Sequence, residues 1–293
     1  MIYFLMGDSQ FNGIRQGAFL LKRCFPVIVK TGRAALLLAV HLVFLPAGVV
    51  IGLLPGIRRT TRMRWKAGGM RKWARSCCFL LGVRVVSSGV REGGACFVVS
   101  NHCSYLDILV IGSLMPSFFV AKAEVDSWPL LGPLARLAGT VFINRASKTA
   151  SVAAMEEIGR RLQVGISVVI FPEGTTNDGI SIGDFKSTLF QVPAKLNLPV
   201  LPLSLRYSRV DGAPLTPERM DAVAWYGDMP LFPHVWNLLG FRRIEARVRF
   251  NPPLPAAEGR KALSALSCTC VREGYALLCA EGRDAPAEQG GGD

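Results

Sequence analysis

The sequence predicts an α/β fold: a mixed, largely parallel central sheet flanked by helices, with an N-terminal membrane-associated helical element. Three observations predict it. Short β-rich runs alternate with helical stretches from residue 82 onward, which requires crossover connections typical of parallel or mixed sheets. A long uncharged segment and a basic segment come before them. The 293 residues are enough for one large domain and an additional element.

We divide the chain into three parts. Residues 1–82 are expected to form the membrane-associated helical segment, and residues 83–282 the α/β domain. Residues 283–293, RDAPAEQGGGD, contain few apolar side chains and are expected to be disordered.

The composition favours a negatively charged binding partner. Half of the residues are hydrophobic and the formal net charge is +13, which suits nucleic acid, an anionic membrane or an acidic carrier protein. The eight cysteines form no repeated C-x-x-C pair and most have apolar neighbours. This pattern favours reduced, buried thiols in a protein whose folded part faces the reducing environment of the cytoplasm. With three scattered histidines, no metal site is expected.

The first element is residues 34–57, which carry no formally charged side chain. A helix of this length would cross a bilayer core of about 30 Å. However, Pro46 and Gly48 interrupt the segment, and lysines and arginines flank both of its ends. We therefore expect a re-entrant hairpin that enters and leaves one leaflet. A single span and a buried soluble helix are the alternatives.

The second element, residues 58–82, begins with many arginines and lysines and contains Trp65 and Trp73. A basic helix that bears tryptophan is typical of a membrane surface. Nucleic acid would bind the same side chains, but the adjoining apolar segment favours a membrane.

The α/β region follows. Its β-rich runs are VRVVSSG, ACFVVS, SFFVA, TVFINR, ISVVIF, VLPLSLRY and IEARVRF, and its helical stretches are about 104–114, 128–138, 148–164, 185–196 and 259–281.

The motif SNHCSYLD, residues 100–107, follows a β-rich run, so His102 lies where a strand meets a helix. That edge of an open α/β sheet is where ligands bind. On an ideal helix, residues five apart are about 140° out of phase. His102 and Asp107 therefore meet only if His102 precedes the first regular turn. Asp107 would then orient one imidazole nitrogen and leave the other as a base. The alternative is that Asn101, His102 and Ser104 merely cap the helix.

The motif FPEGTTNDG, residues 171–179, follows the run ISVVI and lies at the same edge. Gly174 permits a tight backbone path. Glu173 supplies a carboxylate for a substrate hydroxyl or a basic side chain, and Thr175 and Thr176 supply hydroxyls. The same residue types also suit an ordinary β-turn.

A third motif, GTVFINR, ends a strand at Asn144 and Arg145. Arginine binds phosphate or carboxylate groups bidentately. The alternative is a surface arginine at the start of a helix.

Together, these motifs resemble the glycerolipid acyltransferase family, which contains 1-acylglycerol-3-phosphate acyltransferase. NHCSYLD matches the family's H-x-x-x-x-D signature, VFINR resembles its second block and FPEGTT its third, and LPVLPLSL, residues 198–205, resembles its fourth. The resemblance covers roughly residues 70–210, with the blocks in the family's order.

The resemblance implies a mechanism and partners. His102 would take a proton from the hydroxyl of a lysolipid, with Asp107 orienting it, and the hydroxyl would attack an acyl-ACP or acyl-CoA thioester. No other cofactor is implied. Arg145, Glu173, Gly174, Thr175 and Thr176 would bind the acceptor. Membrane lipids would be partners, nucleic acid would not, and the enzyme would lie on the inner (cytoplasmic) membrane and face the cytoplasm.

The sequence departs from the family at one position. Members that form phosphatidate usually read E-G-T-R in the third block, where Thr176 stands here. Either Arg145 or Lys186 compensates for the missing charge, or the acceptor carries no terminal phosphomonoester. The default acceptor is 1-acyl-sn-glycerol-3-phosphate, and lyso-ornithine lipid is the main rival.

Three other functions are weighed against this one. They are a membrane-bound lipid-binding protein with a dead site, a thiol enzyme that uses Cys103, and a nucleic-acid-binding protein. The presence of both His102 and Asp107 disfavours the first. Cys103 adjoins His102 in sequence, and neighbours usually point apart. Only the positive net charge supports a nucleic-acid-binding protein.

Overall fold

The computed structural model describes residues 8–91, 93–129, 131–144, 146–256 and 259–284, with the backbone alone described for 8–25, 148 and 282–284. In chain order, the helices are α1 Asp8–Leu53, α2 Arg59–Leu80, α3 Leu106–Leu114, α4 Ala123–Asp126, α5 Leu131–Leu137, α6 Lys148–Gln163, α7 Gln191–Leu196, α8 Leu231–Leu238 and α9 Arg260–Asp284, with short 3-10 helices at Ser187–Phe190 and Pro217–Ala222. The strands are β1 Val83–Gly89, β2 Phe97–Ser100, β3 Ser117–Lys122, β4 Val141–Ile143, β5 Ser167–Ile170, β6 Val200–Val210, β7 Ala213–Pro214 and β8 Ile244–Phe250.

The strands form one sheet in the order β1-β8-β6-β2-β5-β3-β4, and β7 pairs with β6. From β6 to β4, each strand runs parallel to its neighbour, whereas β8 is antiparallel to β6 and parallel to β1. The mixed, largely parallel sheet predicted from the sequence is therefore confirmed.

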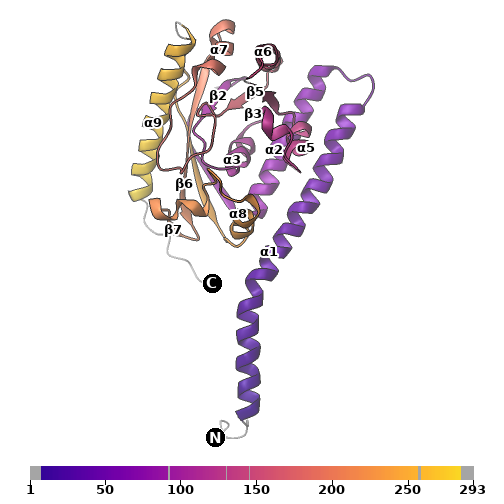
Figure 1. Cartoon of the computed structure of the whole chain (residues 1–293), viewed down its shortest axis with the longest axis vertical. Helices are drawn as coiled ribbons and strands as arrows, with labels where there is room; N and C mark the ends of the chain where they lie inside the picture. Colours follow the sequence, from indigo (N-terminus) through magenta and orange to yellow (C-terminus); the bar gives the residue numbers. More distant parts are fainter. Residues whose placement is uncertain (1–7, 92, 130, 145, 257–258, 285–293) are drawn as a thin grey trace.

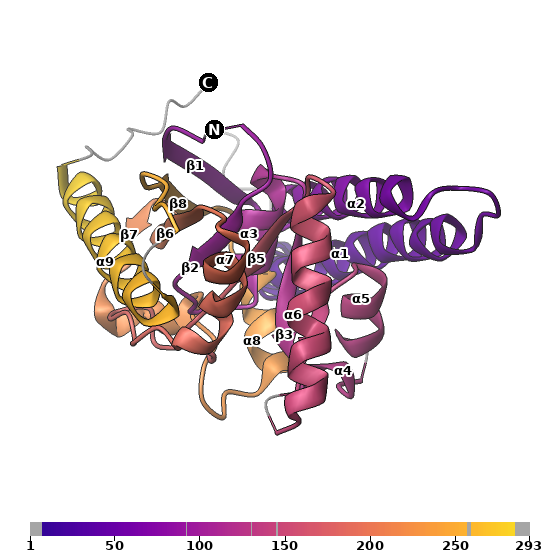
Figure 2. The same ribbon diagram turned by 90° about the horizontal axis from the view of Figure 1, so that it is seen from above.

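Helices cover both faces of the sheet (Figures 1 and 2). Successive side chains of a strand point to opposite faces. In β2, Val98 packs in the cluster that includes residues of α2 and α3. Phe97 and Val99 pack in the cluster built by α6, α7 and α9. This burial on both faces explains why β2 and β5 read as continuous apolar runs rather than alternating ones.

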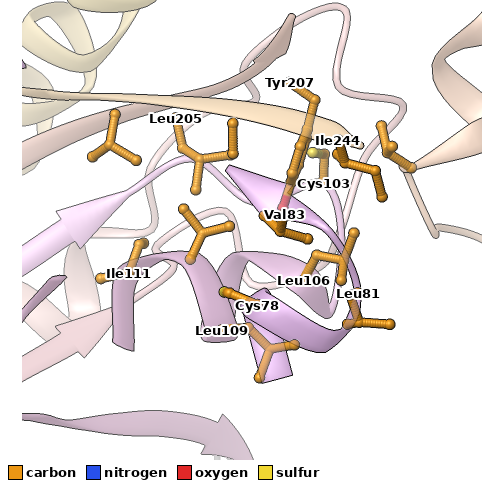
Figure 3. Packing of buried hydrophobic residues seen from close by; sticks show 14 of the residues in the cluster. Cys78, Leu81, Val83, Cys103, Leu106, Leu109, Ile111, Leu205, Tyr207 and Ile244 are labelled. Atoms are coloured by element: carbon orange, nitrogen blue, oxygen red, sulfur yellow. The ribbon is translucent and has the colours of Figure 1, made fainter. Parts of the chain in front are cut away.

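Tyr207 is the largest side chain that is almost fully buried. Figure 3 shows it extending from β6 into the cluster that contains Cys103 and Leu106. The phenol thus reaches the region where α3 begins.

α1 is continuous from Asp8 to Leu53, so the re-entrant hairpin expected within residues 34–57 is wrong. α1 passes through Pro26 and Pro46 and ends at Leu53, and α2 then packs beside it in the opposite direction (Figure 1). Proline removes one backbone hydrogen bond and strains the preceding turn, but here neither proline ends the helix. The turn of the hairpin lies after Leu53, not at Pro46.

The apolar part of α1 is open to its surroundings. Pro26–Leu53 is long and apolar enough to cross a membrane. No residue in its most apolar stretch is buried inside the protein. Large exposed apolar side chains recur along it: Val27, Ile28, Leu36, Leu38, Leu42, Val43, Val49, Val50 and Leu53. We call these residues the α1 apolar stripe.

α2 has a basic exposed face and a buried apolar face. Its basic side chains share the helix with a buried apolar face, made by Ala67, Met70, Ala74, Cys77 and Cys78. This face packs against α3 and the sheet. Residue 82 therefore separates two segments in the sequence, while α2 contributes to the core of the α/β unit. The three-part division of the chain remains a prediction, and most of the predicted tail, residues 285–293, lies outside the described residues.

Candidate active site

Two of the predicted motifs meet at one edge of the sheet. β2 ends at Ser100 and β5 ends at Ile170, and the two strands are parallel neighbours. The motifs that follow them therefore leave the sheet side by side. The N–H of Asn177 donates to the carbonyl oxygen of His102, with 3.1 Å between the two atoms. The sheet thus brings the histidine motif and the FPEGTTND loop into direct contact.

His102 and Asp107 form a close pair. The Nδ1 atom of His102 lies 2.7 Å from Oδ2 of Asp107. The pairing is feasible because α3 begins at Leu106, so His102 precedes the first helical turn. A neutral imidazole that donates from Nδ1 to a carboxylate carries its free lone pair on Nε2. His102 is therefore oriented to act as a base through Nε2.

The Asp107 carboxylate is fully buried and accepts several hydrogen bonds. Besides His102, the backbone N–H groups of Cys103 and Ser104 donate to Oδ2 over 2.8 and 3.0 Å. The hydroxyl of Tyr207 donates to Oδ1 over 2.7 Å. Four donors compensate the buried charge and fix the orientation of the carboxylate.

Tyr207 was not identified from the sequence. It comes from β6, far along the chain from the histidine motif. Burial raises the pKa of its phenol well above the ordinary value, and the Asp107 carboxylate raises it further. The phenol therefore stays protonated and remains a donor. The only signal in the sequence is that Tyr207 shares the two-residue period of Leu203 and Leu205 along the strand.

The imidazole of His102 is also held by stacking. Its ring lies almost parallel to the ring of Phe171, at 10° and with 3.8 Å between the centroids. The side chain of His102 keeps 16% of its surface exposed. The base is therefore oriented on one side by Asp107 and on one face by Phe171, while part of the ring is open to a substrate.

Glu173 is buried and faces the protein. Its Oε1 accepts from the backbone N–H of His102 over 2.8 Å, and its Oε2 accepts from the backbone N–H of Gly183 over 2.7 Å and from the side-chain amide of Asn177. Burial raises the pKa of its carboxyl above the ordinary value, while these donors oppose the rise. Both carboxylate oxygens accept hydrogen bonds from other groups of the protein, which fits a residue that positions His102. Binding of the acceptor by Glu173 stays a prediction.

The rest of the loop is more open. Gly174 has a positive φ of 77°, a conformation that favours glycine, and its N–H donates to the carbonyl oxygen of Phe171. Thr175 is exposed and Thr176 is half-buried. Lys186 is exposed, and its backbone N–H donates to the carbonyl oxygen of Pro172, which ties it to this loop. Binding of the acceptor by Gly174, Thr175 and Thr176 stays a prediction.

The prediction for Arg145 has no counterpart in the described part of the chain, whereas Asn101 can be placed. Arg145 lies outside the described residues, next to Asn144, whose side chain accepts from the N–H of Ala146. The side chain of Asn101 does not cap α3, which is part of the alternative interpretation of this motif. Its amide instead pairs with both the N–H and the carbonyl of Leu205, each over 2.8 Å. Asn101 thus extends the pairing of β2 with β6 beyond the end of the strand. Ser104 accepts from the N–H of Leu106 at the start of α3.

Cys103 is buried and poorly suited to be a nucleophile. Burial raises the pKa of its thiol well above the ordinary value, and the carboxylates of Asp107 and Glu173 raise it further. The thiolate is the reactive form, so this environment disfavours the thiol-enzyme alternative.

Comparisons with known proteins agree with this site. The acyltransferase family, described as "Acyltransferase", matches residues 83–206, which include both motifs. A lyso-ornithine lipid O-acyltransferase from Rhizobium meliloti (strain 1021) is 36% identical over 234 residues, covering 74% of this chain and 80% of the relative. A 1-acyl-sn-glycerol-3-phosphate acyltransferase from Neisseria meningitidis serogroup B is 34% identical, over 61% of this chain and 68% of the relative.

The fold also has a solved counterpart. The crystal structure of the 1-acyl-sn-glycerophosphate acyltransferase PlsC from Thermotoga maritima matches with a TM-score of 0.62 and 20% identity, covering 87% of this chain and 98% of that one. At this identity the match shows the fold alone. The family match and the curated relatives show more, and the resemblance predicted from the sequence motifs is confirmed. The chain belongs to the glycerolipid acyltransferase family and is a lysolipid acyltransferase.

Proposed function

We propose that this enzyme works on a membrane surface and transfers a fatty acyl group from a thioester donor to the free hydroxyl of a lyso-ornithine lipid. The single observation that carries the chemistry is the hydrogen bond between His102 and Asp107. Nε2 of His102 takes the proton of the acceptor hydroxyl as its oxygen attacks the thioester carbonyl carbon. The carbon–oxygen bond forms, the carbon–sulfur bond then breaks, and the proton passes to the departing thiol. Asp107 stabilises the transient imidazolium.

The choice of acceptor rests on the third motif and on the relatives. Thr176 stands where members that form phosphatidate usually carry arginine. A lyso-ornithine lipid has an amino-acid head group in place of a phosphomonoester, so it has less need of that positive charge. Relatives from Rhizobium meliloti (strain 1021), Brucella abortus (strain 2308) and Rhodobacter capsulatus, 33–36% identical to this chain, are described as lyso-ornithine lipid O-acyltransferases.

A second candidate is 1-acyl-sn-glycerol-3-phosphate, the default acceptor of the family. The relative from Neisseria meningitidis is described as acting in that reaction. Lys186 is tied to the loop through the carbonyl of Pro172 and is exposed, so its ammonium is a candidate partner for the phosphate.

The α1 apolar stripe supports the membrane assignment. Burying large apolar side chains in a bilayer is favourable by roughly 25 cal/mol per Å², and the stripe runs through the one described helix that is both long and apolar enough to span a membrane. We place the enzyme on the inner membrane with its active site facing the cytoplasm, where the acyl donor is acyl-ACP or acyl-CoA. The net charge of +13 favours an acidic carrier protein as donor.

A reconstituted assay tests the proposal. Purified enzyme receives acyl-ACP or acyl-CoA together with either lyso-ornithine lipid or 1-acyl-sn-glycerol-3-phosphate, and mass spectrometry measures the product. We expect the higher kcat/KM with lyso-ornithine lipid. Preference for the phosphate acceptor would select the second candidate, and no product from any lysolipid would refute both.

A further inference from the structure

A basic pocket lies away from the active site and has no part in the proposed reaction. Its volume is about 350 Å³, which is in the range of pockets that hold small ligands. It lies between the start of α2 and the segments around α5, β4 and α6. Its lining residues are Gly52, Arg59, Arg62, Met63, Lys66, Phe118, Arg136, Gly139, Thr140, Phe142 and Arg161.

The pocket is at the opposite edge of the sheet from His102. Phe118 is near the start of β3, and Thr140 directly precedes β4. These are the amino ends of parallel strands, whereas His102 follows the carboxyl end of β2. A ligand held here is therefore separate from the reacting groups.

The side chains of the pocket carry one sign of charge. Five of its lining residues are cationic and none is acidic. Three of these cations, Arg59, Arg62 and Lys66, come from α2 with the spacing i, i+3, i+7, so they share one face of the helix. Converging cations that are not matched by anions in the lining favour an anionic ligand.

Arg62 is fixed in place and keeps an unsatisfied donor. Its Nη1 and Nη2 donate to the carbonyl oxygens of Gly52 and Leu54 over 3.2 and 2.6 Å, at the C-terminal end of α1. Its Nε is buried and has no hydrogen-bond partner in the structure. A buried unpaired donor costs free energy unless a ligand or water accepts from it.

The other cations of the pocket differ in how they are compensated. Arg59 and Arg161 each contact Glu157 over 3.1 Å, and Arg136 contacts Asp126 over 3.1 Å. The Arg161 guanidinium also donates to the carbonyl of Gly139 and lies 4.3 Å from the centre of the Phe118 ring.

Lys66 forms no ion pair within the part of the chain that the structure describes. Arg62 donates to the carbonyl oxygens of Gly52 and Leu54, so among the described residues Lys66 and Arg62 are two positive charges of the pocket without a carboxylate partner.

We propose that this pocket binds one phosphate group, with Lys66 as its main charge partner and the free Nε–H of Arg62 as a donor. Arginine and lysine are the side chains best suited to phosphate oxygens. The phosphate belongs either to a lipid head group or to a soluble molecule. A lipid source fits the location, because Gly52 lines the pocket and the next residue, Leu53, ends the α1 apolar stripe with 76% of its surface exposed.

The test compares two lysine substitutions on the same helix. Lys66→Ala removes a charge from the pocket, whereas Lys72→Ala removes an equal charge from an exposed position of α2 outside it. Inorganic phosphate is titrated against the full chain in detergent, and its effect on thermal unfolding is compared with that of chloride at equal ionic strength. We expect phosphate to stabilise the wild type and the Lys72 variant, and to bind the Lys66 variant about tenfold more weakly.

A second arm identifies the source. Flotation with phosphatidylcholine vesicles, with and without phosphatidylglycerol, is measured for the same variants. A larger loss of anionic-vesicle binding in Lys66→Ala than in Lys72→Ala assigns the site to a lipid. Equal losses together with the phosphate response assign it to a soluble phosphate. Both results support the pocket as a phosphate site.

Two further variants keep the result interpretable. Thr140→Trp fills the pocket without changing its charge and should weaken phosphate binding in the same way. His102→Ala should retain the phosphate response, so that failure of the catalytic proposal and failure of this one are distinguishable. Equal responses of Lys66→Ala and Lys72→Ala to phosphate would show diffuse attraction by surface charge and would overturn the proposal.

Discussion

At the scale of single residues, the site is built around the Asp107 carboxylate, which organises its own loop. Because it accepts from His102, Cys103, Ser104 and Tyr207, the carboxylate fixes both the loop before α3 and the imidazole that the loop carries. The proposed base and its scaffold therefore depend on the same hydrogen bonds.

Replacing His102 tests its role as the base. His102→Gln keeps a polar side chain near Asp107 but has no nitrogen that accepts a proton at neutral pH. We expect kcat to fall by roughly 10²–10⁴-fold, with a thermal midpoint close to that of the wild type. Initial rates of acyl transfer and a melting curve measure both. Unchanged turnover would leave His102 with a structural role only.

Tyr207→Phe tests a positioning residue. The substitution keeps the buried ring and removes only the hydroxyl that donates to Asp107. Loss of a hydrogen bond to a charged group costs about 1.5–3 kcal/mol. We expect kcat to fall by about tenfold or more while KM is unchanged. A residue that served stability alone would lower the melting temperature and leave kcat intact in assays well below it.

Cys103→Ala tests the thiol-enzyme alternative. Since the thiol is buried and its pKa is raised, it stays protonated and unreactive. We expect activity within about threefold of the wild type, together with a modest loss of stability from the small cavity. A loss of activity, and an acyl group on Cys103 found by mass spectrometry of the wild type, would reverse this conclusion.

At the scale of elements, α1 carries the row of large exposed apolar side chains named the α1 apolar stripe, and a matched pair of double variants tests its role. Leu38→Glu with Leu42→Glu places charge on the α1 apolar stripe. Leu266→Glu with Leu277→Glu makes the same change at leucines of α9, about half exposed, on the other side of the molecule (Figure 1). We expect only the α1 variant to lose vesicle binding by flotation. Equal losses would contradict insertion of α1.

Glu157 of α6 pairs with Arg59 at the start of α2 and with Arg160 and Arg161 of its own helix. Burial raises the pKa of its carboxyl, but these three arginines together outweigh burial, and the pKa lies below its ordinary value. A carboxyl of this kind stabilises the fold above its unfolded pKa, and this contribution disappears as the pH falls through its folded pKa.

Glu157→Gln should therefore lower the free energy of unfolding by about 1 kcal/mol at neutral pH. The difference from the wild type should shrink as the pH falls and vanish once the pH is below the folded pKa of Glu157. Urea unfolding at neutral pH and at a strongly acidic pH measures it. The exposed neighbour Glu156 serves as the control, since Glu156→Gln removes a charge outside this cluster. A constant difference at both pH values would contradict an ionic origin.

α8 shows why some helices are not predicted from the sequence. Residues 230–236, PLFPHVW, contain two prolines and indicate a loop. In the structure, Pro230 is the N-cap and Pro233 lies in the first turn, where a backbone N–H has no partner within the helix. Proline is therefore tolerated there. Pro46 led to the opposite error: the sequence predicts a break in the helix there, but the loss of one hydrogen bond does not interrupt a helix that extends far on both sides.

At the scale of the whole molecule, the alternation of strands and helices was sufficient to predict the sheet, because each crossover leaves a periodic signal in the sequence. The pairing of His102 with Asp107 was also predictable, since both lie in one short motif. Tyr207 and Phe171 were not, because their contacts depend on the register of β6 and on how the loop after β5 folds back. The basic pocket joins segments far apart in the chain, so no local pattern indicates it.

The backbone of His102 is held at both of its polar groups by the loop that follows β5. Its N–H donates to Glu173, and its carbonyl accepts from Asn177. A head group of the wrong size that pushes this loop aside must also displace the base. Discrimination between lipids would then appear as a slower chemical step rather than only as weaker binding, so that a poorly matched lipid occupies the enzyme without being converted.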